Sequence, residues 1–275
     1  MNRRRVLGAA GMAAAAGAIA PFASHAQDAT PVTGASTPVA VDRSISISSI
    51  VDLTHTLSPT FPVFAGKPQF AMETIVTFAE DGFYGNILTF DEHSGTHMDA
   101  PAHFSAEGAA TADELPIENF FVPLIVIDIS AKAASDDDAA LTADDIAAWE
   151  SDNGEIPAGS FVAMYSGWES RIEDPEAFIN LDAQGVQHFP GIAPDAATFL
   201  VEERDIVGAG VDTVSLDIGA STDFQSHYIL LGAGLYGLEG LANLGTLPPE
   251  GTTIIVGRPK HERASGGPSR VYAVF

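Results

Sequence analysis

The sequence predicts an α/β or α+β domain with a central, partly barrel-like mixed sheet and peripheral helices. Short runs of β-branched, aromatic and other apolar residues recur along the chain, as at 122–129 and 160–165. Helical patterns are few, and the clearest of them begin at Thr142 and Pro194. Gly, Pro and Asn separate these runs, which predicts frequent turns. Strands that alternate with a few helices are typical of a layered domain in which helices cover a sheet.

Composition limits the class of protein and its partners. The chain has 275 residues and 46% of them are hydrophobic, which is enough to build one domain with a real core. It contains no Cys, so disulfides, thiolate ligands and a Cys nucleophile are excluded. Its formal charge of −25 argues against nucleic acid and anionic membranes as partners. Either a solvated surface that keeps the protein soluble or adaptation to salty surroundings would explain this acidity.

Residues 1–26 have the features of an export signal. Three arginines at positions 3–5 precede an apolar, Ala- and Gly-rich run, and Ser24 and Ala26 offer the small residues of a cleavage site. The run R-R-R-V-L resembles a twin-arginine signal, with Val where Phe is usual. That resemblance implies export in the folded state to the periplasm or the outside of the cell, without stable membrane contact after cleavage. An uncleaved membrane anchor is the alternative.

The folded domain is expected to span residues 44–275. Residues 27–43 are rich in Thr, Pro, Ala and Ser without apolar periodicity, which indicates a flexible linker. Alternating apolar residues predict a strand at 45–53. Three prolines and a Gly then indicate a loop at 54–68. Further strands are expected at 73–78 and 86–90, with a turn between them at Asp81-Gly82.

The rest of the chain alternates predicted strands with two capped helices. Thr142, with Asp145 three residues later, predicts a helix that runs through Trp149 and ends at Asn153-Gly154. A second helix is expected from Pro194 to residue 204, because Pro is favoured in the first turn. Strands are predicted at 122–129, 160–165, 206–209 and 213–216, and a small-residue loop at 217–223.

Potential metal ligands are concentrated in residues 90–104, which read F-D-E-H-S-G-T-H-M-D-A-P-A-H-F. Even spacings would place three histidines and an aspartate on one face of an extended segment: His93, His97, Asp99 and His103. Gly95 and Pro101 oppose a helix here, so the segment is expected to be extended and broken by turns. Imidazole with carboxylate suits Zn²⁺, Mn²⁺ or Fe²⁺.

The same stretch resembles the H-x-G-T-H-x-D-x-P-x-H-F signature of the cyclase-like metal hydrolases. That family includes bacterial kynurenine formamidase and isatin hydrolase. All eight fixed positions match: His93, Gly95, Thr96, His97, Asp99, Pro101, His103 and Phe104. The resemblance covers roughly residues 45–275. It implies a swivelling β/β/α fold that forms homodimers.

His227 and Glu239 are a second pair of candidate ligands, in the apolar, Gly-rich stretch 225–244. A Glu among Leu and Gly is unfavourable to bury without a partner, and a cation would be such a partner. On a continuous helix the twelve-residue separation would span roughly 18 Å, so the two side chains meet only if the chain reverses. Taken alone, the pattern also allows a core His and a helix-start Glu.

The family resemblance implies roles for these ligands in a site with two Zn or Mn ions. His93, His97 and Asp99 would hold one ion, and His227 and Glu239 would complete the second site with Asp99. Asp99 and Glu239 would bridge the two ions. A water between two cations is readily deprotonated. The predicted reaction is therefore hydrolysis of a small-molecule amide at its C–N bond, in an aryl formamide or a cyclic amide.

Three further residues are expected to act on the substrate. His103 is left over from the ligand sets, and the resemblance implies that it is the catalytic proton shuttle. Phe64 stands near the position of an aromatic pocket residue in the family. Trp168 stands at the end of a predicted strand, where it could cap the core or form a wall of the pocket, and the pocket is the preferred expectation.

Two other functional classes stay open on the sequence alone. His97-x-Asp99 with His227 also resembles the two-His-one-carboxylate triad of non-haem iron oxygenases, although His93 and Glu239 would over-fill that site. The other class is a non-catalytic exported metal-binding protein. A serine hydrolase is disfavoured because the chain has no G-x-S-x-G motif.

Overall fold

The computed structural model describes residues 46–275, apart from 65–68 and 106–107. The predicted export signal and linker therefore lie outside the described residues. The strands are β1 Ile50–Asp52, β2 Phe70–Val76, β3 Gly85–Phe90, β4 His97–Asp99, β5 Phe121–Asp128, β6 Ala140–Leu141, β7 Phe161–Tyr165, β8 Gly191–Ile192, β9 Gly208–Val211, β10 Tyr236–Glu239, β11 Thr252–Gly257, β12 Gly266–Pro268 and β13 Arg270–Val274. The α-helices are α1 Phe78–Asp81, α2 Ser130–Ala133, α3 Ala143–Asn153, α4 Pro175–Ile179, α5 Pro194–Glu203 and α6 Gln225–Gly232. The 3₁₀ turns are η1 Pro101–His103, η2 Ile117–Phe120, η3 Trp168–Arg171 and η4 Leu244–Thr246.

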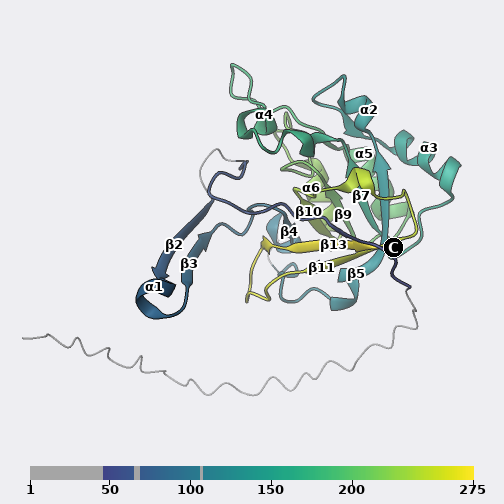
Figure 1. The fold of residues 1–275 in the computed structure, drawn as a ribbon. Coiled ribbons are helices and arrows are strands. Elements are labelled where there is room, and N and C mark those ends of the chain that lie inside the picture. Colours follow the sequence, from purple (N-terminus) through teal and green to yellow (C-terminus); the bar gives the residue numbers. More distant parts are fainter. Residues whose placement is uncertain (1–45, 65–68, 106–107) are drawn as a thin grey trace, which may run out of the picture. The chain divides into compact units, whose positions relative to one another are not determined.

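A nine-stranded mixed sheet forms the centre of the fold (Figure 1). Its strand order is β1-β13-β11-β5-β7-β9-β10-β4-β12. The four strands from β5 to β10 in this order pair in parallel, and the flanking strands pair antiparallel. The sheet curls into a half-barrel with helices at its periphery (Figure 1). The predicted class, an α/β fold with a partly barrel-like mixed sheet, is confirmed.

Both faces of the central strands are buried. Leu124 and Val126 of β5 belong to the cluster inside the curl of the sheet, which also contains residues of β4, β10, β11 and β13. Ile125 and Ile127 alternate with them and belong to a second cluster, together with residues of α3, α5 and α6. The helices therefore cover one face of the sheet. A strand buried on both faces explains the nearly continuous apolar run in the sequence.

The capping signals located α3 and α5, whereas α1, α2, α4 and α6 were not predicted. Thr142 and Asp145 form a reciprocal capping box at the start of α3, and Gly154 follows its last residue. Pro194 is the first residue of α5. The described residues contain no helix long and apolar enough to cross a membrane.

Two predicted strands differ in the structure. The first is limited to Ile50–Asp52, because only these three residues pair with β13. The stretch 213–216 forms no strand, since its backbone groups bond elsewhere. The carbonyl of Thr213 accepts the amide N–H of Gly240, and the amide of Leu216 donates to the carboxylate of Glu239. This stretch therefore serves the candidate site instead of the sheet.

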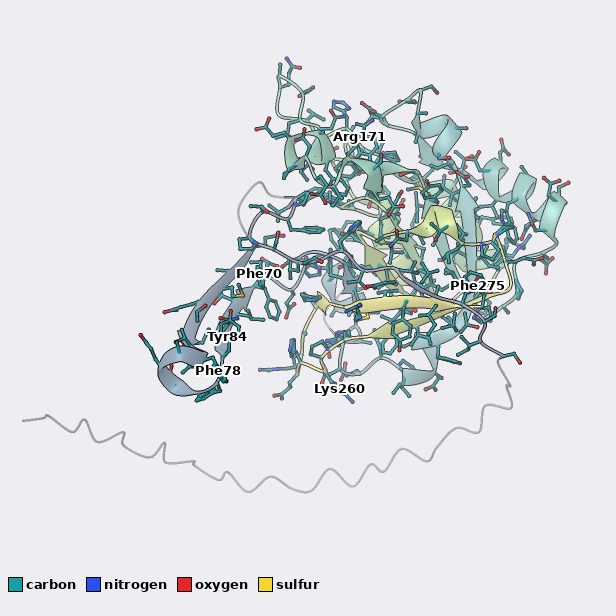
Figure 2. All side chains as sticks on the ribbon, viewed as in Figure 1. Phe70, Phe78, Tyr84, Arg171, Lys260 and Phe275 are labelled. Carbon is teal, nitrogen blue, oxygen red and sulfur yellow. The ribbon has the colours of Figure 1, made fainter. Side chains whose placement is uncertain are left out.

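β2 and β3 form a separate two-stranded hairpin, which α1 and a left-handed Gly82 connect. Figure 1 shows that this hairpin runs apart from the nine-stranded sheet. Apolar side chains on it are exposed, including Phe78 at 76% and Tyr84 at 62%. Figure 2 shows both of them at the far end of the hairpin, with Phe70 near its base. An isolated hairpin is marginally stable in water, so these exposed side chains need an explanation.

Candidate metal centre

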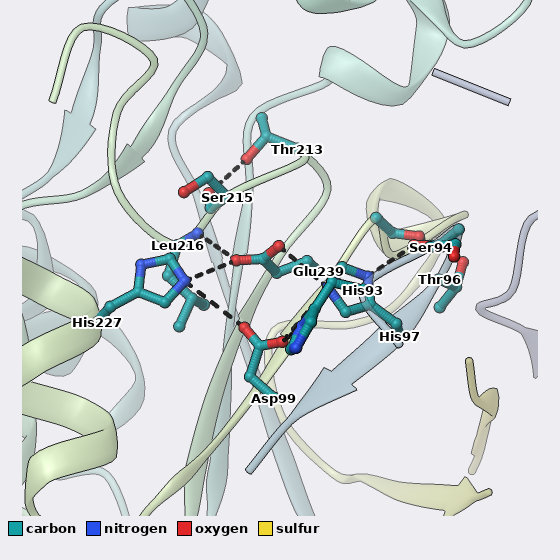
Figure 3. Close-up of polar contacts among 12 residues, drawn as sticks. His93, Ser94, Thr96, His97, Asp99, Thr213, Ser215, Leu216, His227 and Glu239 are labelled. Atoms are coloured by element: carbon teal, nitrogen blue, oxygen red, sulfur yellow. Dashed lines mark hydrogen bonds and ion pairs between the residues drawn. The ribbon is translucent and has the colours of Figure 1, made fainter. Parts of the chain in front are cut away.

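Two antiparallel strands, β4 and β10, bring the two halves of the predicted site together. His97 lies directly opposite Glu239, and Asp99 lies opposite Gly237. His97 and Asp99 are two residues apart on β4, so both side chains point to the same face of the sheet. His97 Nε2 is 3.3 Å from Asp99 Oδ1 and 3.3 Å from Glu239 Oε2 (Figure 3). The strand pairing thus joins residues that are far apart in the sequence.

His93 and His103 lie outside the strand and reach the site from turns on either side of it. The Nδ1 atom of His93 is 2.7 Å from Asp99 Oδ1. His103 ends the 3₁₀ turn η1, and its ring stacks on that of His93 with centroids 3.7 Å apart. The extended, turn-broken segment predicted from the sequence therefore directs all four side chains to one place.

His227 completes the cluster from the first turn of α6. Its Nε2 atom is 3.0 Å from Glu239 Oε1 and 3.5 Å from Asp99 Oδ2 (Figure 3). The chain reverses between α6 and β10, where Gly234 adopts a left-handed conformation. This is the reversal that the spacing of His227 and Glu239 required.

The ligand atoms group differently from the expected sets. One atom each from His93, Asp99 and His103 lie within 4.8 Å of one another, as do atoms of His97, Asp99 and Glu239. His103, which we expected to remain free as a proton shuttle, is therefore within reach of one group. Asp99 belongs to both groups, and its expected role as a bridge between two ions stays a prediction.

The cluster fits a divalent cation. Asp99 is fully buried and Glu239 is 5% exposed, so two carboxylates lie together away from water. His97 Nε2 and Asp99 Oδ2 are buried and have no hydrogen-bond partner among the described residues. Buried polar atoms without partners are rare and unfavourable. Nitrogen and oxygen donors in this number suit Zn²⁺ or Mn²⁺.

The electrostatics of the cluster also favour positive charge. Burial alone lowers the pKa of His97, but the negative charges of Asp99 and Glu239, each 3.3 Å from its Nε2 atom, outweigh it and raise the pKa to about 10. Burial alone raises the pKa of Asp99, whereas the surrounding imidazoles hold it well below its usual range. The two carboxylates thus create a strongly negative pocket, which a bound cation would neutralise.

The imidazole of His103 has a different environment. Burial lowers the pKa of His103 to about 4, although Asp99 acts in the opposite direction. The ring is therefore neutral near pH 7. A neutral imidazole carries a lone pair that can accept a proton.

The cluster opens into a cavity of about 320 Å³. Phe61, Phe64, Phe104 and Phe224 line it, together with His97 and Glu239 at its base. The ring of Phe224 lies 6.1 Å from that of Phe64 and 5.5 Å from that of Phe104, measured between centroids. A cavity of this size with aromatic walls and a few polar groups is typical of small-molecule sites.

Phe224 is held in a strained backbone conformation at the edge of this cavity. Its φ of 50° lies in the left-handed region, which a bulky residue rarely adopts. It immediately precedes α6, whose first turn carries His227. Strain of this kind is often retained at functional sites.

Comparison with known proteins identifies the family. The model of a family described as putative cyclase matches residues 51–218, which is more than half of the chain. The chain belongs to this cyclase family. Isatin hydrolase from Roseibium aggregatum is 38% identical over 241 residues, which cover 82% of this cyclase and 91% of the relative. Kynurenine formamidase from Salinibacter ruber is 30% identical over 207 residues, which cover 73% and 85%.

Solved structures agree with this assignment. Isatin hydrolase A from Labrenzia aggregata, bound to benzyl benzoate, superposes with a TM-score of 0.78 at 41% identity. The alignment covers 82% of this cyclase and 93% of that chain. The predicted family and fold are confirmed. The named relatives are hydrolases, which favours a hydrolase over the oxygenase and the metal-binding protein that the sequence left open.

The structure brings the aromatic residue Phe64 of this cyclase to the cavity but not Trp168. Phe64 and the neighbouring Phe61 both line the cavity. Trp168 is 2% exposed and packs with Phe178 and Phe189 in a separate cluster. Its indole N–H donates to the carbonyl of Phe178. The expectation that Trp168 forms a wall of the pocket is therefore wrong, because a buried hydrogen bond fixes its ring elsewhere.

Among the described residues, His188 and His261 belong to neither group of candidate ligand atoms, and a third histidine, His55, packs against Phe61 instead. His188 pairs with Asp138 and Asp182 at the surface. His261 stacks against Phe90. Neither was expected to be a ligand.

Sequence patterns missed two contacts that hold the ligands of this cyclase. The backbone N–H of Leu216 donates to Glu239 Oε1 at 2.9 Å (Figure 3). The carboxylate of Asp217 accepts the Nδ1–H of His227 at 2.6 Å. Asp217 lies in a stretch that reads as a small-residue loop, and its spacing to any other candidate ligand gives no signal.

Proposed function

We propose that this protein hydrolyses the C–N bond of a cyclic or aryl amide, using water activated at a centre of two divalent ions, Zn or Mn. One observation carries the proposal: a buried cluster of histidine, aspartate and glutamate lies at the base of an aromatic cavity. The isatin hydrolase and kynurenine formamidase relatives named above support the same general reaction, hydrolysis of an amide C–N bond.

The residues of the cluster divide between two functions. His93, His97, Asp99, His227 and Glu239 would hold the ions, with Asp99 shared between them. When bound, divalent ions lower the pKa of water and polarise a carbonyl oxygen. Near neutral pH, the lone pair of His103 can accept a proton from the nucleophile and return it to the leaving nitrogen.

The cavity walls favour an aromatic substrate. Phe61, Phe64, Phe104 and Phe224 can stack on a planar ring, while the amide faces the polar base of the cavity. The isatin hydrolases are more similar to this chain than the formamidases named above, at 38–41% against 30% identity. Isatin is a lactam fused to an aromatic ring. We therefore place a fused cyclic amide first and an aryl formamide second.

A substrate panel tests this proposal. Isatin, N-formylkynurenine, a simple dihydropyrimidine and an aliphatic formamide are assayed side by side with metal-loaded protein. We expect the highest kcat/KM on isatin, and a rise in its KM in Phe64→Ala. Preference for the aliphatic compound, unchanged by Phe64→Ala, would rule out the aromatic pocket. If the protein binds both ions but hydrolyses none of the four compounds, a non-catalytic metal-binding protein becomes the favoured function.

The exposed hairpin supports a homodimer as the working assembly. Apolar side chains are exposed on both of its strands, including Met72 and Ile75 on β2 and Ile87 and Leu88 on β3. An exposed apolar surface of this kind marks a protein-interaction site more often than a free surface. A second copy of the chain would cover it by a closed, two-fold contact.

Export is part of the proposed function. The twin-arginine-like signal predicted at residues 1–26 implies that the substrate is met outside the cytoplasm. Cell fractionation tests this: the mature protein should begin near Gln27 outside the cytoplasm, and changing Arg3 and Arg4 to Lys should retain it inside.

A further inference from the structure

Asp217 is a buried carboxylate beside the metal centre that belongs to none of the ligand groups. It is 3% exposed and lies in the loop between β9 and α6. Its Oδ2 atom accepts the Nδ1–H of His227 at 2.6 Å. Because the Nδ1–H group donates its hydrogen bond to the carboxylate, the lone pair of Nε2 is left to face the site.

The orientation of His227 follows from this hydrogen bond. With Nδ1 held by Asp217, Nε2 lies 3.0 Å from Glu239 Oε1 and 3.5 Å from Asp99 Oδ2. A histidine binds a metal through a nitrogen that carries no proton, and the bond made by the other nitrogen decides which one is free. Asp217 therefore selects the tautomer of His227 that can act as a ligand.

We propose that Asp217 is a positioning residue, which fixes the ring orientation and tautomer of His227 for metal binding. This inference rests on the proposed metal centre. The neighbouring residue supports the same half of the site, since the amide of Leu216 donates to Glu239 Oε1 at 2.9 Å. Two adjacent residues thus hold two ligands that come from different elements, α6 and β10.

Asp217 also stabilises the start of α6, and an experiment has to distinguish this structural role from its effect on His227. Its Oδ1 accepts the amide N–H of Ser226 at 2.8 Å, and its Oδ2 accepts the amide of His227 at 3.1 Å. These bonds satisfy free N–H groups in the first turn of α6. Removing the side chain would disturb the helix as well as the histidine, so Asp217→Ala alone is not decisive.

The substitution Asp217→Asn changes the contact with the ring while preserving the contact with Ser226. The Asn side chain keeps one oxygen for the amide of Ser226, whereas the NH₂ group in place of Oδ2 can only donate and no longer accepts the Nδ1–H or the backbone N–H of His227. A donor at Nδ1 moves the ring proton to Nε2, the atom that faces Asp99 and Glu239. We expect zinc affinity, measured calorimetrically by titration of the metal-free protein, to fall about 10- to 100-fold.

Ser226→Ala is the matched control at the same end of the helix. Its hydroxyl donates to the carbonyl of Ile192 at 2.6 Å, so the substitution weakens the attachment of α6 without touching the nitrogens of His227. We expect Ser226→Ala to lower Tm while zinc affinity stays within a few-fold of wild type. Imidazole ¹⁵N NMR of the zinc-loaded proteins should show Nδ1–H for His227 in wild type and Nε2–H in Asp217→Asn.

The outcomes distinguish this inference from the proposed function. If wild type binds zinc and Asp217→Asn binds it equally well, the positioning role is overturned. Equal losses of affinity in Asp217→Asn and Ser226→Ala would assign Asp217 to helix stability alone and overturn it too. If wild type itself binds neither Zn²⁺ nor Mn²⁺, the metal centre fails, and the positioning role fails with it.

Discussion

His103 is the residue whose role depends most on its exact neighbours. It stacks on His93, and together with His93 and Asp99 it forms one of the two groups of ligand atoms. Burial also keeps its imidazole neutral near pH 7, with a pKa of about 4. His103 could therefore act as a proton shuttle or as a third metal ligand. The metal content of a variant without the His103 side chain distinguishes the two roles.

We predict that His103→Ala retains both ions and loses about 10²- to 10⁴-fold in kcat, the usual contribution of general acid–base catalysis. Steady-state kinetics and elemental analysis of the same preparation measure both quantities. His97→Ala is the matched comparison, since it should lose metal as well as activity. Loss of metal in His103→Ala would reassign His103 as a ligand.

At the residue scale, the sequence identified the atoms but not how they are held. Even spacing and residue type located four members of the cluster, and the family resemblance added His227 and Glu239. The contacts of Leu216 and Asp217 were missed because a backbone amide has no sequence signature and a single loop aspartate resembles many others. Trp168 was misplaced because its hydrogen bond to the carbonyl of Phe178 depends on a distant packing arrangement.

At the element scale, the loop at 213–217 depends on a close approach to β8. The amide N–H of Ile192 donates to the carbonyl of Leu216 at 2.7 Å. A Cβ atom at Gly191 would lie 2.6 Å from the carbonyl oxygen of Asp217, which is closer than side-chain carbons approach a backbone oxygen. Gly191 therefore permits the loop to reach the metal centre.

We predict that Gly191→Ala displaces this loop, which destabilises the protein by about 1–3 kcal/mol and weakens metal binding. Denaturant unfolding and zinc titration measure the two effects. Gly232→Ala is the control, because a Cβ there meets nothing within 4 Å. Unchanged zinc affinity in Gly191→Ala would show that the loop position is not needed for the site.

A second loop is attached by His188. Its Nδ1 lies 2.8 Å from Asp138 Oδ2, and Asp182 lies on its other side. The hydrogen bond to Asp138 raises the pKa of His188, although partial burial opposes this. A raised folded-state pKa means that the stabilisation is complete below the unfolded-state value of about 6.5 and disappears as pH rises through the folded-state value.

We predict that the Tm difference between wild type and His188→Gln is largest below pH 6.5 and shrinks as pH rises through the raised pKa. Thermal unfolding across pH 5 to 9 measures this difference. His261→Gln provides a surface control without the two carboxylates. A constant difference across this range would show that the charge of His188 does not matter.

Elements with a local chemical signal were predictable, and those without one were not. The helix α3 was located by its capping box, and α5 by its proline. The stretch 213–216 has the composition of a strand, but the amide of Leu216 donates to Glu239, and the carbonyls of Thr213 and Leu216 accept from Gly240 and Ile192. The sheet order could not be read from the sequence, because it depends on pairing between distant segments.

At the scale of the whole molecule, the hairpin of β2 and β3 is the surface on which the proposed dimer depends. Phe78 and Tyr84 lie at its far end (Figure 2). We predict that wild type sediments as a dimer in analytical ultracentrifugation and that Phe78→Ser with Tyr84→Ser sediments as a monomer. The fold of the monomer should persist, since both side chains are more than half exposed.

Ile117→Ser is the control for this prediction, because Ile117 is 80% exposed and lies on η2, outside the hairpin. It should leave the dimer intact. A dimer that survives the double substitution and dissociates with Ile117→Ser would move the interface away from the hairpin.

The pairing of β4 with β10 has a kinetic consequence. Thr96 and Gly240, which a side-chain hydrogen bond joins beside the metal centre, are 144 residues apart in the sequence. Closing a loop of this length is slow relative to forming local structure, so the ligands meet only late in folding. An ion that binds there would hold the segments of β4 and β10 together and slow unfolding. The compartment in which the chain folds would then decide which metal it carries.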